Sequence, residues 1–171
     1  WYSDPSCTNL VHSGNYWAHP SISSNITYYI REMLPAGIDT VGASDNTQGG
    51  GFFGNANYIH YLIFDADDDF LLKSVKVHAD GSGSRTIALR DKNQNIIESK
   101  TMNIPDGVSR IDLNFNVPQG QDLQLAGMGA PDLYRTSNGS YLNYPYQINN
   151  LVNIKHSSAS SDPYSYYYYF Y

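Results

Sequence analysis

Hydrophobic and polar residues alternate along most of the chain with the two-residue period of a half-buried β-strand. The clearest case is residues 108–117 (VSRIDLNFNV), where Ile111, Leu113, Phe115 and Val117 would face one way and the polar residues between them the other. The turn sequences IPDG and VPQG bracket this segment. The pattern therefore predicts a strand with one face in a core and the other in solvent.

Further apolar segments of strand length recur at intervals of about 8–12 residues, separated by turn sequences such as DGSGS and RDKNQN. No segment sustains the 3.6-residue period of an amphipathic helix. We therefore expect an all-β fold whose main part is an antiparallel β-sandwich, jelly-roll-like in topology. The other expected strands are residues 58–64, 70–79, 85–91, 96–104, 122–128 and 146–156, and the tyrosine-rich strip at 162–171.

The chain divides by composition into three parts. Residues 1–34 resemble two strands joined by a polar turn, and we expect them to be the end of a preceding module. Residues 35–51 contain five glycines and no apolar run, which predicts a linker or a long loop. Residues 52–171 would form the sandwich. Both ends of the chain look like the middle of a strand, so we expect a segment of a longer polypeptide.

Two stretches resemble modules of secreted Bacteroidota proteins. The Trp-Tyr strand, the Gly-Asn turn and the Thr-Tyr-Tyr strand in residues 1–30 resemble the end of a short immunoglobulin-like repeat. The LNFNVP strand followed by the tyrosine strip resembles a second, tyrosine-rich β-sandwich accessory module of the same proteins. The resemblance implies a short immunoglobulin-like β segment before the sandwich, neighbouring modules in the same chain, type IX secretion, and a secreted or bacterial cell-surface location.

The composition narrows the function classes. Charged residues make up 15% of the 171 residues, against an average of about 25%, and such a polar but weakly charged surface is typical of extracellular domains. The net charge of −6 argues against a nucleic-acid partner. No run of about 18 apolar residues exists, so we expect no membrane insertion. The one cysteine, Cys7, allows neither an internal disulfide nor a thiolate metal cluster.

Catalytic motifs are missing from the sequence. The five histidines are scattered, and neither a His-Glu-x-x-His pair nor a Gly-x-Ser-x-Gly elbow occurs. His78 and Asp80 would share one strand face, so the carboxylate could orient the imidazole as a base, but no nucleophile accompanies them. We therefore expect that the chain is not an enzyme.

An acidic run, DADDD, follows the strand predicted at 58–64. Its carboxylates are those of Asp65, Asp67, Asp68 and Asp69. Clustered carboxylates suit calcium, which takes six to eight oxygen ligands, although the run lacks the glycine and distant Glu of an EF-hand loop. A solvated hairpin is the alternative. Structural calcium is thus the one cofactor that the sequence suggests.

Aromatic residues interleaved with hydrogen-bonding side chains suggest a glycan site. The chain has 16 tyrosines, and residues 133–150 mix them with Asn, Gln and Arg. Sugars stack on aromatic rings and bind such polar groups through their hydroxyls, whereas the alternative is that the rings form stabilising cross-strand pairs. The candidate ligand-binding residues are Tyr134, Arg135, Asn138, Tyr141, Asn143, Tyr144 and Tyr146.

The C-terminal strip raises the same choice between core and binding surface. Strand alternation would place Tyr166, Tyr168 and Phe170 on one face and the tyrosines between them on the other. One row would fill the core. The other would need cover from the N-terminal segment, the loop 133–146, a ligand or a neighbouring module.

Together these patterns favour a non-catalytic extracellular recognition module, glycan-binding or adhesive, whose partner is a polysaccharide or cell-surface glycan. The alternative is a structural spacer or stalk module of an adhesin or filament with no ligand of its own. Asp39-Thr40-Val41 also resembles the O-glycosylation pattern of Bacteroidota proteins, which makes Thr40 a candidate modification site.

Overall fold

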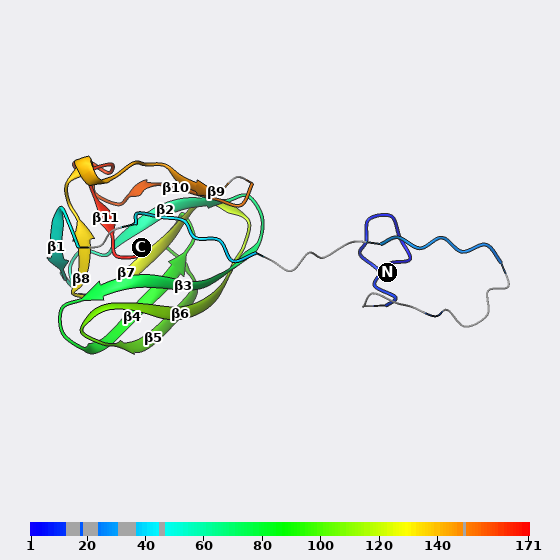
Figure 1. Ribbon diagram of the computed structural model, residues 1–171, viewed down its shortest axis with the longest axis horizontal. Coiled ribbons are helices and arrows are strands. Elements are labelled where there is room, and N and C mark those ends of the chain that lie inside the picture. The colour runs from blue at the N-terminus through cyan, green and yellow to red at the C-terminus, as the bar shows by residue number, and fades with distance from the viewer. Residues whose placement is uncertain (13–17, 19–23, 31–36, 45–46, 149) are drawn as a thin grey trace. The chain divides into compact units, whose positions relative to one another are not determined.

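The computed structural model describes residues 1–12, 18, 24–30, 37–44, 47–148 and 150–171, and its regular elements there are β-strands and one 3₁₀ turn (Figure 1). The chain divides into two units, Trp1–Ile38 and Asp39–Tyr171. Among the described residues no helix has the length and apolar character needed to cross a membrane.

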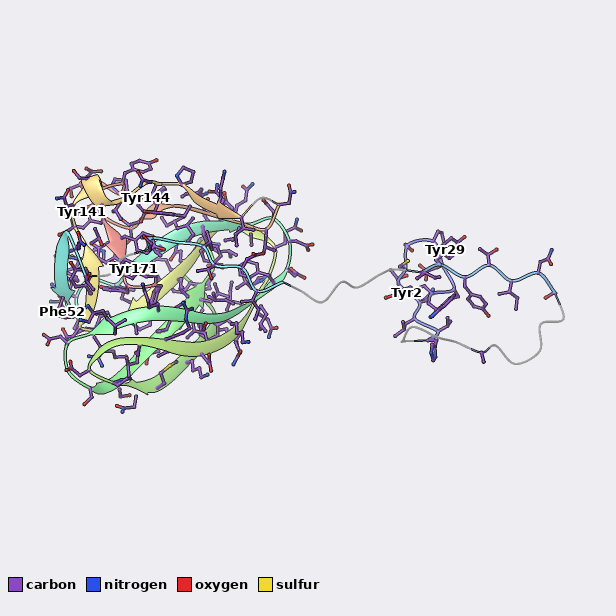
Figure 2. The ribbon with its side chains drawn as sticks, viewed as in Figure 1. Tyr2, Tyr29, Phe52, Tyr141, Tyr144 and Tyr171 are labelled. Carbon is purple, nitrogen blue, oxygen red and sulfur yellow. The ribbon has the colours of Figure 1, made fainter. Side chains whose placement is uncertain are left out.

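The first unit contains isolated β-bridges rather than regular strands. Tyr2 pairs antiparallel with both Leu10 and Tyr29. Figure 2 labels the two tyrosines. The Asp4 carboxylate closes the turn between Tyr2 and Leu10 by accepting hydrogen bonds from the backbone N–H groups of Thr8 and Asn9. Much of the predicted immunoglobulin-like segment (13–17, 19–23 and 31–34) lies outside the described residues, and that resemblance stays a prediction.

The second unit is a sandwich of two antiparallel sheets (Figure 1). One sheet has the order β1 (Gly50–Phe53), β8 (Leu133–Thr136), β3 (Phe70–Ala79), β6 (Gly107–Val117), and β11 (Tyr167–Tyr168) also pairs with β8. The other has the order β5 (Ile96–Ile104), β4 (Gly83–Arg90), β7 (Gly120–Met128), β2 (His60–Ala66), β10 (Val152–Ser157), β9 (Tyr146–Ile148). The orders β1-β8-β3-β6 and β2-β7-β4-β5 are those of a jelly roll, which confirms the predicted fold class.

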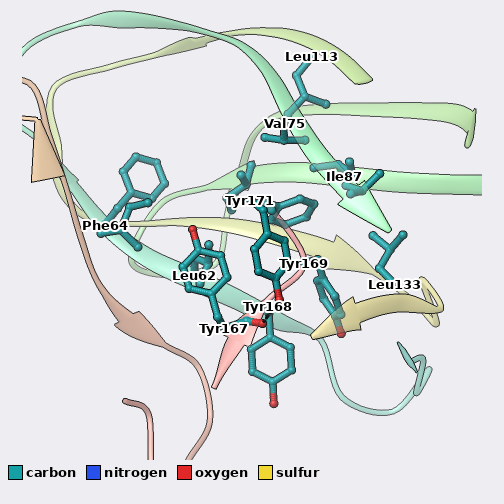
Figure 3. Close-up of a cluster of buried hydrophobic side chains, with 14 of the residues drawn as sticks. Leu62, Phe64, Val75, Ile87, Leu113, Leu133, Tyr167, Tyr168, Tyr169 and Tyr171 are labelled. Carbon is teal, nitrogen blue, oxygen red and sulfur yellow. Dashed lines mark hydrogen bonds between the residues drawn. The ribbon is translucent and has the colours of Figure 1, made fainter. Parts of the chain in front are cut away.

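The core lies between the two sheets, and the alternation read from the sequence explains it. In β6 the four apolar residues from Ile111 to Val117 are buried and the polar residues between them are exposed, as predicted. A bulge at Asn114, whose φ is 57°, interrupts the pairing of β6 with β3 without reversing this pattern. Figure 3 shows the resulting cluster, to which both sheets contribute.

Residues Tyr167–Tyr171 of the C-terminal strip are core, whereas Tyr164 is exposed and Tyr166 is half-buried. The predicted alternation of two faces is wrong for this part. The cover expected from the loop 133–146 is present, because Tyr144 and Tyr146 pack on Tyr167. Each residue from Tyr167 to Tyr171 is at most 6% exposed. The strip pairs with β8 at Tyr167 and Tyr168, then turns sharply: the Phe170 N–H donates to the Tyr168 carbonyl around Tyr169, whose φ is 81°. This γ-turn breaks the alternation of faces that an extended strand would have.

The same strip fills a gap in the first sheet. Strands β3 and β8 pair with each other only at Ala79 and Leu133. Where they diverge, Tyr171 exchanges both backbone hydrogen bonds with Lys76 of β3, while β11 bonds to β8. Figure 3 shows the tyrosine rings of the strip among the apolar side chains of the core. The terminal tyrosines therefore complete the sheet and occupy its interior at once.

Part of the segment predicted as a linker also packs on the sandwich. Ala43 is 6% exposed and belongs to the core, and the Lys76 Nζ donates to the Ser44 carbonyl. Gly42 has a φ of 131°, and a Cβ there would lie 2.5 Å from the Tyr167 hydroxyl. Only glycine combines this conformation with so close an approach. Residues 42–44 thus form a strap over the strip, and the last two residues of the predicted segment, Gly50 and Gly51, belong to β1.

Candidate ligand-binding site

The seven residues proposed from the sequence as ligand contacts do not form one surface. Tyr134 is 6% exposed, and its ring packs against His78 and Phe52 with centroid distances of 5.5 and 5.8 Å. Arg135, the next residue in β8, lies on the opposite side of the strand, as alternation requires. The two candidates nearest in sequence therefore belong to different clusters.

Tyr144 and Tyr146 are half-buried and belong to the packing around the C-terminal strip. The Tyr144 ring is stacked on Tyr167 at 5.8 Å, and its hydroxyl donates to the Tyr166 carbonyl at 2.8 Å. Burial raises the pKa of Tyr144 far above its ordinary value, so its hydroxyl stays protonated and donates this bond. Tyr146 packs edge-on against Tyr167 at 5.5 Å. These contacts favour the structural alternative for both residues.

The remaining candidates are exposed, and two of them serve local structure. Asn138 caps the 3₁₀ turn Gly139–Tyr141, because its Oδ1 accepts from the Ser140 N–H at 3.0 Å. The Asn143 N–H donates to the Tyr146 hydroxyl at 2.9 Å. Tyr141 is 52% exposed and lies, like Tyr144 and Phe52, at one end of the sandwich (Figure 2).

Arg135 is the centre of a different group, which the sequence alone did not reveal. Its guanidinium carbon lies 4.0 Å from the ring centre of Phe53 and 5.2 Å from that of Tyr166. Its Nη1 donates to the Tyr168 hydroxyl at 3.0 Å. With His60, which is stacked on Tyr168, these residues form what we call the Arg135 cluster.

His60 is held rigidly in this cluster. Its ring is parallel to that of Tyr168 at a centroid distance of 4.2 Å, and its Nδ1 lies 3.0 Å from the Ser158 hydroxyl oxygen. That oxygen accepts from the Tyr61 N–H, so the hydroxyl proton is available to the imidazole. Burial, together with the charge of Arg135, lowers the pKa of His60. The ring is therefore neutral at pH 7.

The members of the cluster differ in exposure. Tyr168 is 1% exposed, whereas Phe53, His60, Arg135 and Tyr166 are half-buried. Four strands supply members: β1 carries Phe53, β2 begins at His60, β8 carries Arg135 and β11 carries Tyr168. Proximity to aromatic residues in sequence pointed to Arg135. No local pattern could reveal Phe53, His60 and Tyr166, because only the pairing of β1 and β11 on either side of β8 brings them together.

The carboxylates of the acidic run have separate partners. Asp65 lies 2.8 Å from the Lys155 Nζ and accepts from the Asp122 N–H, while Asp69 accepts from the Gln119 N–H. Asp67 and Asp68 are exposed, and the described residues contain no group of three or more His, Cys, Asp or Glu side chains placed to hold a metal ion.

Structural calcium stays a prediction. If it binds this run, calcium should raise the thermal unfolding midpoint and EDTA should lower it, whereas an identical midpoint under both conditions would remove the ion from consideration. Thr40, the candidate modification site, is exposed.

Comparison of the chain with protein-family models, curated proteins and solved structures found no match.

Proposed function

We propose that the sandwich is a non-catalytic recognition module that binds a glycan through the Arg135 cluster. Arg135 or Tyr168 covers one face of the Phe53, Tyr166 and His60 rings. Because all three residues are half-buried, the rest of their ring surface is what the C–H groups of a sugar would contact. The guanidinium of Arg135 offers several N–H donors in a fixed plane to sugar hydroxyls. Such a combination of aromatic walls with few, well-placed polar groups is typical of small-ligand sites.

The observation that carries this proposal is the guanidinium of Arg135, which lies over the half-buried rings of Phe53 and Tyr166 at 4.0 and 5.2 Å from their centres. The stacking removes the freedom of a long side chain before any ligand arrives, which lowers the entropy cost of binding. In the cellular context that the sequence favours, the module would act outside the cell within a longer protein that carries neighbouring modules.

A spacer without a ligand is the second candidate, and the fully buried C-terminal strip supports it. Five consecutive aromatic residues that could have formed a platform instead fill the core. Much of the tyrosine content is therefore explained by stability alone, and the recognition proposal now depends on the rings of the Arg135 cluster.

Affinity gel electrophoresis of the full chain against a broad panel of polysaccharides tests the proposal. We expect retardation by at least one polymer, loss of that retardation in Tyr166→Ala and Phe53→Ala, and no change in Tyr141→Ala. Tyr141 is a matched control because it is an exposed tyrosine outside the cluster. Retardation by no polymer, or retardation that both cluster variants retain, would refute glycan binding at this site and favour the spacer.

A further inference from the structure

Resting on the proposed function, we propose that the ligand is an acidic glycan whose sugar carboxylate pairs with Arg135. The ion pairs among the described residues are those of Lys155 with Asp65 and Asp122, and none includes Arg135. Arg85 and Arg90, which are more deeply buried, also lack an ion pair among the described residues, so Arg135 must be distinguished by its hydrogen bonds and its exposure.

The three arginines of the sandwich that are not exposed differ in the hydrogen bonds that their guanidinium nitrogens make. Arg85 donates to backbone carbonyls through all three of its nitrogens. Arg90 is 3% exposed, and its Nε and Nη2 are sealed from solvent. Arg135 has one hydrogen bond, through Nη1, and its other nitrogens are not among the sealed atoms. Arg135 is thus the one of the three that is half-buried rather than buried and has two donor nitrogens without a hydrogen bond to any described residue.

The open edge of Arg135 suits a carboxylate. With Nη1 engaged by the Tyr168 hydroxyl, Nε and Nη2 remain, and their parallel N–H groups match the two oxygens of a carboxylate. The rings of Phe53 and Tyr166 keep water from the guanidinium where they contact it, which strengthens an ion pair with a carboxylate. A uronic acid supplies both parts of this complement, because its carboxylate is fixed to a sugar ring that can lie against Tyr166 or Phe53.

The net charge of the chain argues that any binding of an acidic polymer comes from a local site rather than from a general attraction to polyanions. The chain as a whole repels polyanions at neutral pH because its net charge is −6. A preference for an acidic polymer must therefore come from a local site. His60 adds no charge of its own at pH 7.

The test uses the full chain with polygalacturonate, its fully methyl-esterified form, a neutral galactan and dextran sulfate, in isothermal titration at matched ionic strength. We expect polygalacturonate to bind at least tenfold more tightly than its methyl ester, because esterification removes the charge and leaves the sugar ring. In Arg135→Gln this ratio should fall to about one. Arg135→Lys should keep part of it, since it keeps charge without the fork. Arg110→Gln, which removes an exposed arginine of β6, should leave it unchanged.

The outcomes are distinguishable. Equal binding of the acid, ester and neutral polymers would overturn the carboxylate assignment and leave glycan recognition standing. Dextran sulfate binding as tightly as polygalacturonate would show that charge rather than a carboxylate is recognised, and would also overturn it. Binding of none of the polymers would count against the proposed function itself. The comparison of acid and ester uses the unmodified protein, so a folding defect in a variant cannot obscure it.

Discussion

Arg85 should be among the largest single contributors to the stability of the sandwich. It is 8% exposed and is hydrogen-bonded to backbone carbonyls from three separate segments, which it holds together. The acceptors are the carbonyl oxygens of Asp80, Gly81, Gly83, Ile104 and Pro131. The segments are the turn between β3 and β4, the end of β5, and the loop before β8.

Arg85→Met keeps most of the apolar side-chain volume and removes every donor. The carbonyls of Pro131 and Ile104 are buried and lose their partner, whereas those in the turn can bind water. Each orphaned buried carbonyl costs about 1–3 kcal/mol, so the two together cost about 2–6 kcal/mol. Because the substitution also relieves the desolvation of the guanidinium, we expect a net loss of about 3 kcal/mol.

Urea unfolding followed by tyrosine near-UV circular dichroism measures this loss. Both tryptophans, Trp1 and Trp17, precede the sandwich, so the buried tyrosines are the better reporters. A loss of about 3 kcal/mol is a large fraction of the free energy of unfolding of a typical domain, which is about 5–15 kcal/mol. In a thermal unfolding experiment the same loss would lower the midpoint temperature by roughly 10 °C. Arg110→Met, on the exposed side of β6, should stay within about 0.5 kcal/mol of the parent. If Arg85→Met were equally mild, the argument from orphaned carbonyls would be wrong.

Three further substitutions test single interactions by the same urea method. Arg90→Met should raise the unfolding midpoint, because it removes two buried nitrogens that have no hydrogen-bond partner in the described part of the chain, and Met can keep the apolar contact with the Tyr61 ring; a lower midpoint would contradict this. Tyr169→Phe should leave the free energy of unfolding unchanged, because the buried Tyr169 hydroxyl has no hydrogen-bond partner among the described residues. Tyr171→Phe should lower it by about 1–3 kcal/mol, because the buried Thr136 N–H of β8 loses its acceptor. Equal effects of the two substitutions would refute this distinction. The hydrogen bond from Lys155 lowers the pKa of Asp122 in the folded protein. The pair therefore stabilises the fold at pH values above the pKa of an unfolded Asp, which is about 3.9. This contribution is lost as the pH falls through the lower pKa of Asp122 in the folded protein. Lys155→Ala should therefore reduce stability by less than about 1 kcal/mol at pH 7 and by less still at pH 2, and a larger loss at pH 2 would contradict the sign.

The alternating pattern predicted most strands of the sandwich, most clearly the half-buried β6. It did not predict the four-residue strands β1 and β8, and it read β9 and β10 as one strand. The pattern failed at the C-terminal strip for a specific reason. Tyr169 adopts a positive φ, which is rare for a residue with a large side chain, and no sequence signal marks it. The composition of the strip is compatible both with an extended strand and with a strand that turns back into the core. The strip turns because β3 and β8 diverge beyond Ala79 and Leu133, which leaves room for its last residues to pair with β3.

The candidate site was predictable only in part, because it combines residues from distant segments. Arg135 lies within a tyrosine-rich stretch and could be singled out. Phe53 follows three glycines in an unremarkable short strand, and His60 begins a strand that reads as core. Their contacts depend on which strands neighbour β8 and on the stacking of His60 on Tyr168. The sequence therefore indicated the chemistry of the site more readily than its membership.

The two candidate functions would compete if a neighbouring module bound at the Arg135 cluster. Tyr58 and Ile59 directly precede His60 and are 64% and 36% exposed, whereas Phe52 packs on Tyr134, on the opposite side of the strand from Arg135. A neighbouring module that buried His60 and Phe53 would also cover the guanidinium of Arg135. Recognition and a module–module contact at this cluster therefore exclude each other. A longer natural fragment that binds polygalacturonate as well as this chain does would leave the cluster open for a ligand, whereas loss of that binding in the longer fragment would assign the same surface to an interface between modules.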